Sequence, residues 1–208
     1  MISLTDITGL FSAVLLVSTI ATIVVPFKYR SVTSHCVFLL LSIGLCLIPL
    51  GPVPIAFYVR GLVGDLCVPN LLIQILTLVA FVTGSSFLDK RKLERFCFLL
   101  LPLALAFYPL SMGLGKYDPY SLGYGSLLLL GILFVIALLA WALSYWFIAI
   151  SLSLSVFCYA IGWYESNNLW DYLIDPVLSI YALYVSIGAY RHRLHFGLRR
   201  PMAATLDD

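Results

Sequence analysis

Residues 124–164, YGSLLLLGILFVIALLAWALSYWFIAISLSLSVFCYAIGWY, contain no charged side chain. As one continuous helix this stretch would extend for ~60 Å, about twice the thickness of a bilayer's hydrocarbon core. It must therefore turn once. The turn is predicted near residues 141–146, where AWALSYW supplies amphipathic rings suited to the membrane interface. The stretch predicts two membrane spans, at about 122–141 and 145–163.

The composition of the whole chain agrees with a membrane environment. Of its 208 residues, 62% are hydrophobic and 11% are charged, whereas soluble domains average about 45–50% apolar and about 25% charged residues. Apolar runs occupy nearly the whole chain, so we expect one transmembrane domain, residues 1–208, whose main partner is the lipid bilayer. The net charge of +2 is too small to indicate a nucleic-acid partner.

The other apolar runs predict five further spans, at about 7–26, 35–58, 68–88, 96–112 and 169–190. The fold class is therefore all-α, a polytopic integral membrane protein with seven transmembrane helices. Pro49, Pro52 and Pro54 are expected to distort the second span, because each removes a backbone donor. The first run has no basic segment before it and no clear cleavage site, so we expect it to be an uncleaved span.

The basic residues indicate the orientation, because cytoplasmic loops of membrane proteins are enriched in lysine and arginine. An outside N-terminus and a cytoplasmic C-terminus place ten of the twelve basic residues on the inner side: Lys28, Arg30, Lys90, Arg91, Lys92, Arg95, Arg191, Arg193, Arg199 and Arg200. Only Arg60 and Lys116 fall outside. The expected location is a bacterial inner (plasma) membrane.

This orientation gathers the acidic residues on the outer side. The predicted ligand or ion-pair cluster comprises Arg60, Asp65, Lys116, Asp118, Glu165, Asp171 and Asp175, and Asp6 lies in the outer tail. Arg60 is a natural counter-ion for the carboxylates, and binding of a lipid phosphate is the alternative. We expect the cluster to converge near the outer membrane surface.

WYESNNLWDYLIDP, residues 163–176, carries the carboxylates closest to a span. Asp171 and Asp175 are spaced i, i+4, which on a helix places both on one face. Asn168 is a candidate helix cap, which makes Asp171 a first-turn acid. Asp175 precedes Pro176, and a carboxylate at a helix kink is typical of ion or proton sites in membranes. The alternative for Asp175 is a structural ion pair with Arg60 or Lys116.

The loop GLGKYDPYSLGYG, residues 113–125, has an Asp118–Pro119 step that predicts a helix start. Its tyrosines suit either an aromatic belt at the interface or contacts to a ligand. SLGYGS, residues 121–126, resembles the TVGYG filter of potassium channels but differs in its first two positions. GLVGD and GLGKYD, at 61–65 and 113–118, are similar to elements of intramembrane aspartyl proteases, where two aspartates form an acid/base dyad. Val63 interrupts the GxGD triplet, and the likeness covers about a dozen residues.

No sequence pattern predicts a cofactor or a metal. The three histidines, His35, His192 and His195, fall at the inner face or in the tail, and no H-E-x-x-H motif, G-x-S-x-G elbow or Walker loop is present. Three hypotheses remain. The first is a non-enzymatic protein that transports or binds a cation, proton or small polar solute; the second is an accessory subunit docking an extracytoplasmic partner; the third is a membrane-embedded carboxylate enzyme.

Overall fold

The computed structural model describes residues 4–25 and 31–197, and this part of the chain is mostly helical. The helices are α1 (Leu4–Val24), α2 (Val32–Leu47), α3 (Ile55–Val63), α4 (Val68–Thr83), α5 (Lys90–Ser111), α6 (Leu127–Ala142), α7 (Trp146–Ala160), α8 (Trp170–Leu173) and α9 (Pro176–Gly197), with a 3₁₀ helix η1 (Pro119–Gly123). Two short strands, β1 (Pro49–Leu50) and β2 (Val53–Pro54), form an antiparallel hairpin.

Three helical segments of the described chain are long and apolar enough to span a membrane: Thr5–Val24, Lys90–Ser111 and Trp170–Arg193. The protein is therefore a membrane protein. Helices α2, α4, α6 and α7 are also apolar but shorter, with 15 or 16 residues each. A helix of that length rises about 24 Å, a little less than the ~30 Å hydrocarbon core.

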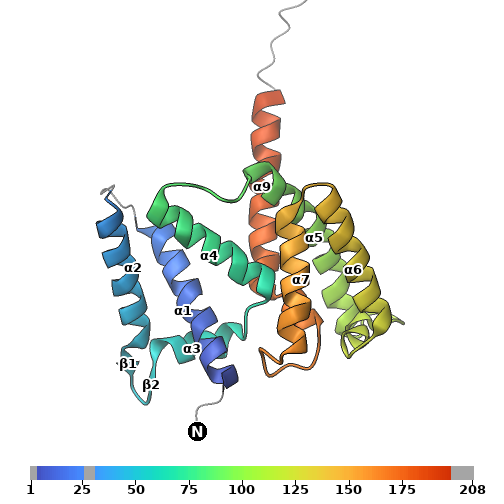
Figure 1. The fold of residues 1–208 in the computed structure, drawn as a ribbon, viewed down its shortest axis with the longest axis horizontal. Helices are drawn as coiled ribbons and strands as arrows, with labels where there is room; N and C mark the ends of the chain where they lie inside the picture. Colours follow the sequence, from blue (N-terminus) through green and yellow to red (C-terminus); the bar gives the residue numbers. More distant parts are fainter. Residues whose placement is uncertain (1–3, 26–30, 198–208) are drawn as a thin grey trace, which may run out of the picture.

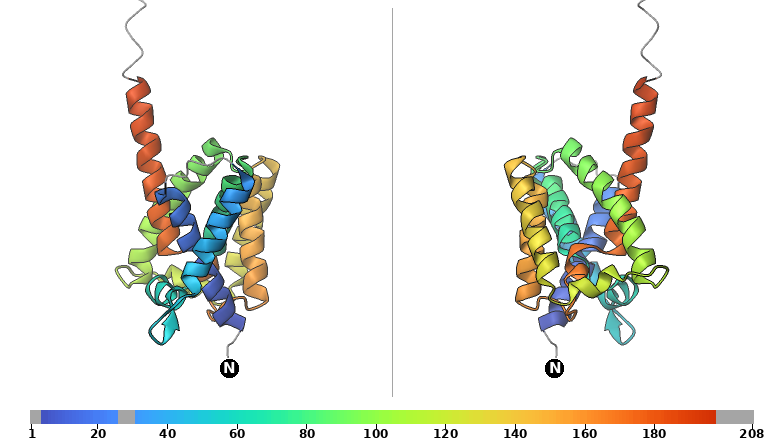
Figure 2. Two further views of the ribbon diagram at one scale, coloured as in Figure 1. Left: turned by 90° about the vertical axis from the view of Figure 1, so that its left-hand side faces the viewer. Right: turned by 90° about the vertical axis from the view of Figure 1, so that its right-hand side faces the viewer.

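The helices run alternately in opposite directions (Figure 1). In that view α1, α4, α6 and α9 run upward, and α2, α5 and α7 run downward. The hairpin, α3, η1 and the 161–175 segment all gather at the lower end, where α1 begins, and both views of Figure 2 agree. Helix α5 packs on α9, α6 on α7, and α1 on α2, α3 and α4.

The predicted second span, 35–58, is divided in the structure. Helix α2 ends at Leu47, and the chain turns through the hairpin, with Gly51 at a φ of 80°, before α3 begins at Ile55. Three prolines explain the break, because each lacks a backbone donor and disfavours helical geometry in the residue before it. Helix α3 then extends to Val63, past the predicted end of the second span at residue 58, and it carries Arg60.

The segment 169–190 is also interrupted, which makes the i, i+4 prediction for Asp171 and Asp175 wrong. Helix α8 ends at Leu173, Ile174 is extended with φ −146° and ψ 137°, and Pro176 begins α9. Proline suits the first helical position but disfavours helical geometry just before it. The two carboxylates therefore belong to separate elements and do not share a helix face.

Other boundaries lie close to their predicted positions. Helix α6 ends at Ala142 and α7 begins at Trp146, on either side of Ser144, whose φ is 60°. Helix α4 starts at Val68, whereas α5 starts at Lys90, inside the charge cluster and before the predicted residue 96. Pro26, Lys28, Arg30, Arg199 and Arg200, which the span and orientation predictions use, lie outside the described residues.

Candidate functional site

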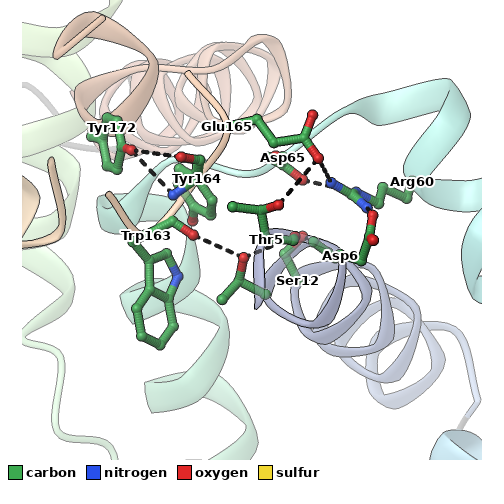
Figure 3. Close-up of polar contacts among 11 residues, drawn as sticks. Thr5, Asp6, Ser12, Arg60, Asp65, Trp163, Tyr164, Glu165 and Tyr172 are labelled. Atoms are coloured by element: carbon green, nitrogen blue, oxygen red, sulfur yellow. Dashed lines mark hydrogen bonds and ion pairs between the residues drawn. The ribbon is translucent and has the colours of Figure 1, made fainter. Parts of the chain in front are cut away.

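Arg60 is the centre of an ion-pair cluster at the end of the molecule where α1 begins (Figure 3). Its Nη1 lies 3.0 Å from Asp6, its Nε 3.0 Å from Asp65, and its Nη2 3.4 Å from Glu165. These carboxylates come from α1, the segment after α3 and the segment after α7. One guanidinium therefore faces three carboxylates, which leaves an excess of negative charge.

Arg60 keeps its positive charge in this cluster. Burial lowers the pKa of its guanidinium, whereas hydrogen bonds to Asp65 and Asp6 raise it. The net pKa lies above its ordinary value. The side chain is only 16% exposed, so its ion pairs are shielded from solvent more than ordinary surface pairs. The cluster holds α1, α3 and the 161–169 segment together.

Helix α1 also binds the 161–169 segment through threonines. Thr5 Oγ1 donates to Glu165 Oε1 at 3.2 Å, and Thr8 Oγ1 donates to the Trp163 carbonyl at 2.9 Å (Figure 3). Thr5, Asp6 and Thr8 all lie in the first two turns of α1. The N-terminal turns of α1 thus position the glutamate opposite Arg60.

Tyr164 anchors the same segment from the other side. Its hydroxyl donates to the Leu66 carbonyl, and its backbone N–H donates to the Tyr172 hydroxyl at 3.1 Å. Burial raises the pKa of the Tyr164 phenol, chiefly by desolvation, so this hydroxyl remains a donor. Tyr172 is fully buried. These bonds fix the relative positions of Asp65 and Glu165, each of which is adjacent in sequence to an anchored residue.

Asp171 accepts hydrogen bonds from two hydroxyls. Tyr120 donates to it at 3.0 and 3.2 Å, and Ser166 donates as well. Burial and the bond to Asp171 raise the pKa of the Tyr120 phenol. Asp118, the predicted cap, accepts from the Tyr120 backbone N–H at 2.9 Å. Asp118 therefore acts indirectly, by holding the turn that presents Tyr120.

Gly123 allows η1 to approach α8 closely. A Cβ on Gly123 would lie 1.7 Å from Asn168 Oδ1 and 2.8 Å from Trp170 Cδ1. Asn168 itself donates to the Tyr120 carbonyl at 2.9 Å and accepts from the Trp170 N–H at 2.9 Å. The N-cap of α8 is Leu169, which makes no side-chain cap bond, so Asn168 forms a turn before the helix and is not the predicted cap. Asn168 thus links η1 to α8 and brings Tyr120 within reach of Asp171.

Asp175 is buried, with 4% exposure, and all its recorded partners are neutral. Its carboxylate accepts from the Cys67 N–H at 2.7 Å, the Leu178 N–H at 2.6 Å and the Asn70 amide at 3.0 and 3.1 Å. The expected ion pair with Arg60 or Lys116 is not formed. The carboxylate lies instead between the N-termini of α4 and α9, whose dipoles stabilise negative charge.

Asn70 and Gln74 form part of the hydrogen-bonded site around Asp175, although neither was predicted from the sequence. Both are buried, and Gln74 Nε2 donates to Asn70 Oδ1 at 3.0 Å while Asn70 bonds Asp175. The available signal was two amides spaced i, i+4 inside the apolar run that forms α4, a spacing that places them on one helix face.

Four of the predicted carboxylates line one cavity of about 490 Å³. Its polar lining consists of Asp65, Glu165, Asp171 and Asp175 together with the hydroxyls of Tyr108, Ser111, Tyr120, Tyr164 and Ser166, and its apolar lining comes from Phe107, Met112, Ile174 and Pro176. No basic side chain of the described chain lines it. We call it the acidic cavity.

One hydroxyl of the acidic cavity lacks a protein partner. The Ser111 Oγ atom is buried and makes no hydrogen bond within the described residues. It comes from the last turn of α5, which the sequence predicted only as part of a span. Buried polar atoms are normally paired, so this hydroxyl is available to a bound solute or water. The hydroxyl of Tyr108, in the same turn, lies beside Ser179.

The remaining predicted residues lie outside the acidic cavity. Arg60 flanks it through its bonds to Asp65 and Glu165, whereas Lys116 and Asp118 are exposed on the 112–126 loop. Within the described ranges, no group of three or more histidine, cysteine or acidic side chains has the arrangement of a metal site. The cavity therefore offers carboxylates and hydroxyls for electrostatic and hydrogen-bonding recognition.

Comparisons with protein-family models, curated proteins and solved structures find no match for this chain. The class of the protein accordingly follows from its own fold and site: a helical membrane protein with a carboxylate-lined cavity at one end.

Proposed function

We propose that the protein binds a cation or a small positively charged polar solute in the acidic cavity, as part of transport across the membrane. The observation that carries this proposal is the cavity itself, with four carboxylates and no basic lining side chain among the described residues. A low-dielectric pocket that concentrates one sign of charge attracts the opposite charge.

The proposed topology has α1, α2, α4, α5, α6, α7 and α9 crossing a bacterial inner membrane, with the N-terminus outside and the C-terminus in the cytoplasm. The alternating helix directions support it (Figure 1). Lys90, Arg91, Lys92 and Arg95 lie at the start of α5, and Arg191 and Arg193 lie towards the end of α9, as the positive-inside rule requires. Local bilayer thinning accommodates the shorter helices.

Within this topology the acidic cavity opens on the outer side. Its position at the N-termini of α4 and α9 resembles the arrangement in transporters, where helix ends inside the protein bind ions. Hydrogen bonds to protein groups hold the Asp175 carboxylate in place. Its negative charge therefore adds to the electric field of the cavity. Asp171, whose carboxylate accepts only from two hydroxyls among the described residues, is the carboxylate best suited to contact a solute directly.

The test compares Asp171→Asn with Asp118→Asn. Both changes remove one negative charge from the same end of the molecule, but only Asp171 lines the acidic cavity. Thermal unfolding of the purified protein is measured with Na⁺, K⁺, Ca²⁺ and methylammonium in turn. At a hundredfold excess over Kd, a bound cation should stabilise the protein by about 2.7 kcal/mol.

We expect one of these cations to stabilise the parent protein and Asp118→Asn equally, and to stabilise Asp171→Asn much less. Uptake of that cation into proteoliposomes should show the same order. Equal stabilisation of all three proteins, or of none, would reject the acidic cavity as a cation site. Binding without any uptake would leave the site in place but reject transport.

A second candidate function, that of an accessory subunit, is supported by the exposed apolar residues of the 112–126 loop. Met112, Leu114 and Tyr117 are each about four-fifths exposed beside the acidic cavity, and aromatic and methionine side chains are enriched at protein interfaces. Stoichiometric co-purification of an extracytoplasmic protein that Tyr117→Ser abolishes would favour this candidate; retention of the partner by the variant would count against it.

A further inference from the structure

A second cavity, of about 760 Å³, shares Ile174 with the acidic cavity, but no carboxylate of the described residues lines it. It lies between α5 and the α6–α7 pair, because residues of all three helices line it. Helix α5 packs on α9 and α6 on α7, and in Figure 2 these two pairs lie on opposite sides of the molecule. We call it the apolar groove. One face of α6, from Leu129 to Leu143, forms most of one wall, and α5 forms the other.

Four polar side chains line the apolar groove, and two of them are already hydrogen-bonded to protein carbonyls. Ser151 Oγ already donates to the Phe147 carbonyl at 2.6 Å, and Trp170 Nε1 donates to the Pro119 carbonyl at 2.9 Å. The other two polar lining residues are Arg95 and Tyr145, which lie together at the end where α5 begins. The rest of the wall is hydrocarbon or aromatic.

Two cations lie at this polar end, and a third lies over Phe98, three residues further along α5. Arg95 donates to the Tyr145 hydroxyl, Lys92 donates to the Ser144 carbonyl at 2.8 Å, and both cations lie about 6 Å from the Tyr145 ring centre. Arg193 of α9 lies 5.4 Å from the ring centre of Phe98, a groove-lining residue.

Lys92, Arg95 and Arg193 have more N–H donors than their recorded hydrogen bonds use. No carboxylate of the described chain lies within 4.0 Å of their nitrogens. An arginine has five N–H donors and a lysine three. The bonds to Tyr145 and Ser144 therefore orient the cations while most of their donors remain available to an anion.

The dimensions of the apolar groove suit a hydrocarbon chain. Leu129 to Leu143 covers about 21 Å of helix, whereas one leaflet contributes roughly 15 Å of hydrocarbon. Leu99, Ile132 and Leu139 along it are about half exposed or more, so the groove is open sideways to the bilayer. A chain entering from the basic end would lie along α6 towards Trp170.

We propose that the apolar groove holds an acyl chain of an anionic phospholipid, whose phosphate is bound by Lys92, Arg95 and Arg193. The occupant is a membrane lipid because a long apolar wall and a cationic end coincide in one cavity. A free phosphate would use only the cationic end, and a neutral lipid only the wall. The proposal does not rest on the cation site: the two cavities share Ile174, but no carboxylate of the acidic cavity takes part in lipid binding.

The first test compares ligands on the purified, delipidated protein. Native mass spectrometry should show one phosphatidylglycerol molecule retained in preference to phosphatidylcholine, and no retention of glycerol 3-phosphate. Equal retention of the two lipids would show an annular lipid only and overturn the proposal. Retention of glycerol 3-phosphate as strong as that of phosphatidylglycerol would overturn it in favour of an anion site without a lipid.

The second test uses matched variants. Arg95→Ala should weaken phosphatidylglycerol binding about fivefold, whereas Arg91→Ala, in the same charge cluster but outside the groove, should not. Ile136→Trp should fill the groove and exclude the chain, whereas Val135→Trp, at the neighbouring position of α6, should leave binding intact. Both α6 positions are more than two-fifths exposed, so either tryptophan fits without disturbing the core. Unchanged binding in Arg95→Ala and Ile136→Trp would reject the proposal.

Discussion

Gly9 provides the space in which Arg60 lies against α1. A Cβ at this position would be 2.1 Å from Arg60 Nε and 2.5 Å from Asp65 Oδ1. Glycine inside a helix is destabilising by roughly 0.5–1 kcal/mol relative to alanine, and here the ion-pair cluster occupies the space gained. The sequence indicated that Arg60 and Asp65 could pair, but it gave no sign that Asp6 and Gly9 of α1 complete the arrangement.

Gly9→Ala should therefore lower the free energy of unfolding by about 1–3 kcal/mol, because the new methyl group displaces the Arg60 guanidinium. Gly44→Ala in α2 is the matched control. A Cβ on Gly44 meets no atom within 4 Å, so that change should stabilise the protein by about 0.5–1 kcal/mol. Chemical unfolding of the purified proteins measures both, and equal stabilisation by the two alanines would contradict this account of Arg60.

Two elements of this protein begin with an Asp–Pro step, η1 at Asp118–Pro119 and α9 at Asp175–Pro176. Local chemistry predicts such starts, because aspartate caps the first turn and proline suits the first helical position. For Asp118 this local role is the whole of what the structure records. Asp175 has a further role, since its carboxylate also accepts from α4 and so joins two helix N-termini.

Asp175→Asn should destabilise the protein by roughly 1–3 kcal/mol, because an amide group in place of one carboxylate oxygen turns a donor towards the donors of Cys67 or Leu178. Asp118→Asn should change stability by less than about 0.5 kcal/mol, because asparagine is an equally good cap at an exposed turn. Thermal unfolding distinguishes them. A neutral effect of Asp175→Asn would show that the two helix ends do not depend on the carboxylate.

At the scale of the whole molecule, the acidic cavity and the cationic end of the apolar groove lie at opposite ends of the helix bundle. The acidic cavity lies at the end where α1 begins, and Lys92 and Arg95 lie in the first turns of α5 at the other end (Figure 1). The proposed orientation follows from the positive-inside rule. It would place the two proposed sites on opposite sides of the membrane.

The orientation predicts that a membrane-impermeant maleimide labels Lys116→Cys in intact cells, and labels Asp89→Cys only after the membrane is opened. The background needs one change, Cys36→Ser, because Cys46, Cys67, Cys97 and Cys158 are buried and protected whereas Cys36 is exposed. Labelling of both positions, or of Asp89→Cys alone, in intact cells would contradict an outer acidic cavity.

Local and compositional features of the sequence determined several properties of this protein: the bilayer as its solvent, its helical class, the turn between α6 and α7, and the cap at Asp118. Each depends on residues within a few positions of one another, or on a length that the bilayer dictates. The sequence also selected the four carboxylates of the acidic cavity, because acidic residues beside membrane spans are rare.

Only the tertiary structure decided how these residues combine. In the structure Asp171 and Asp175 belong to separate elements, and the Asp175 carboxylate lies between the N-termini of α4 and α9. The tertiary structure paired Arg60 with Asp6 and Glu165, 54 and 105 positions away. It also added Tyr108 and Ser111 to the cavity. The physical reason is that such contacts depend on which helices pack together, and the nearly uniform apolar surface of these helices carries almost no pattern that specifies the neighbour.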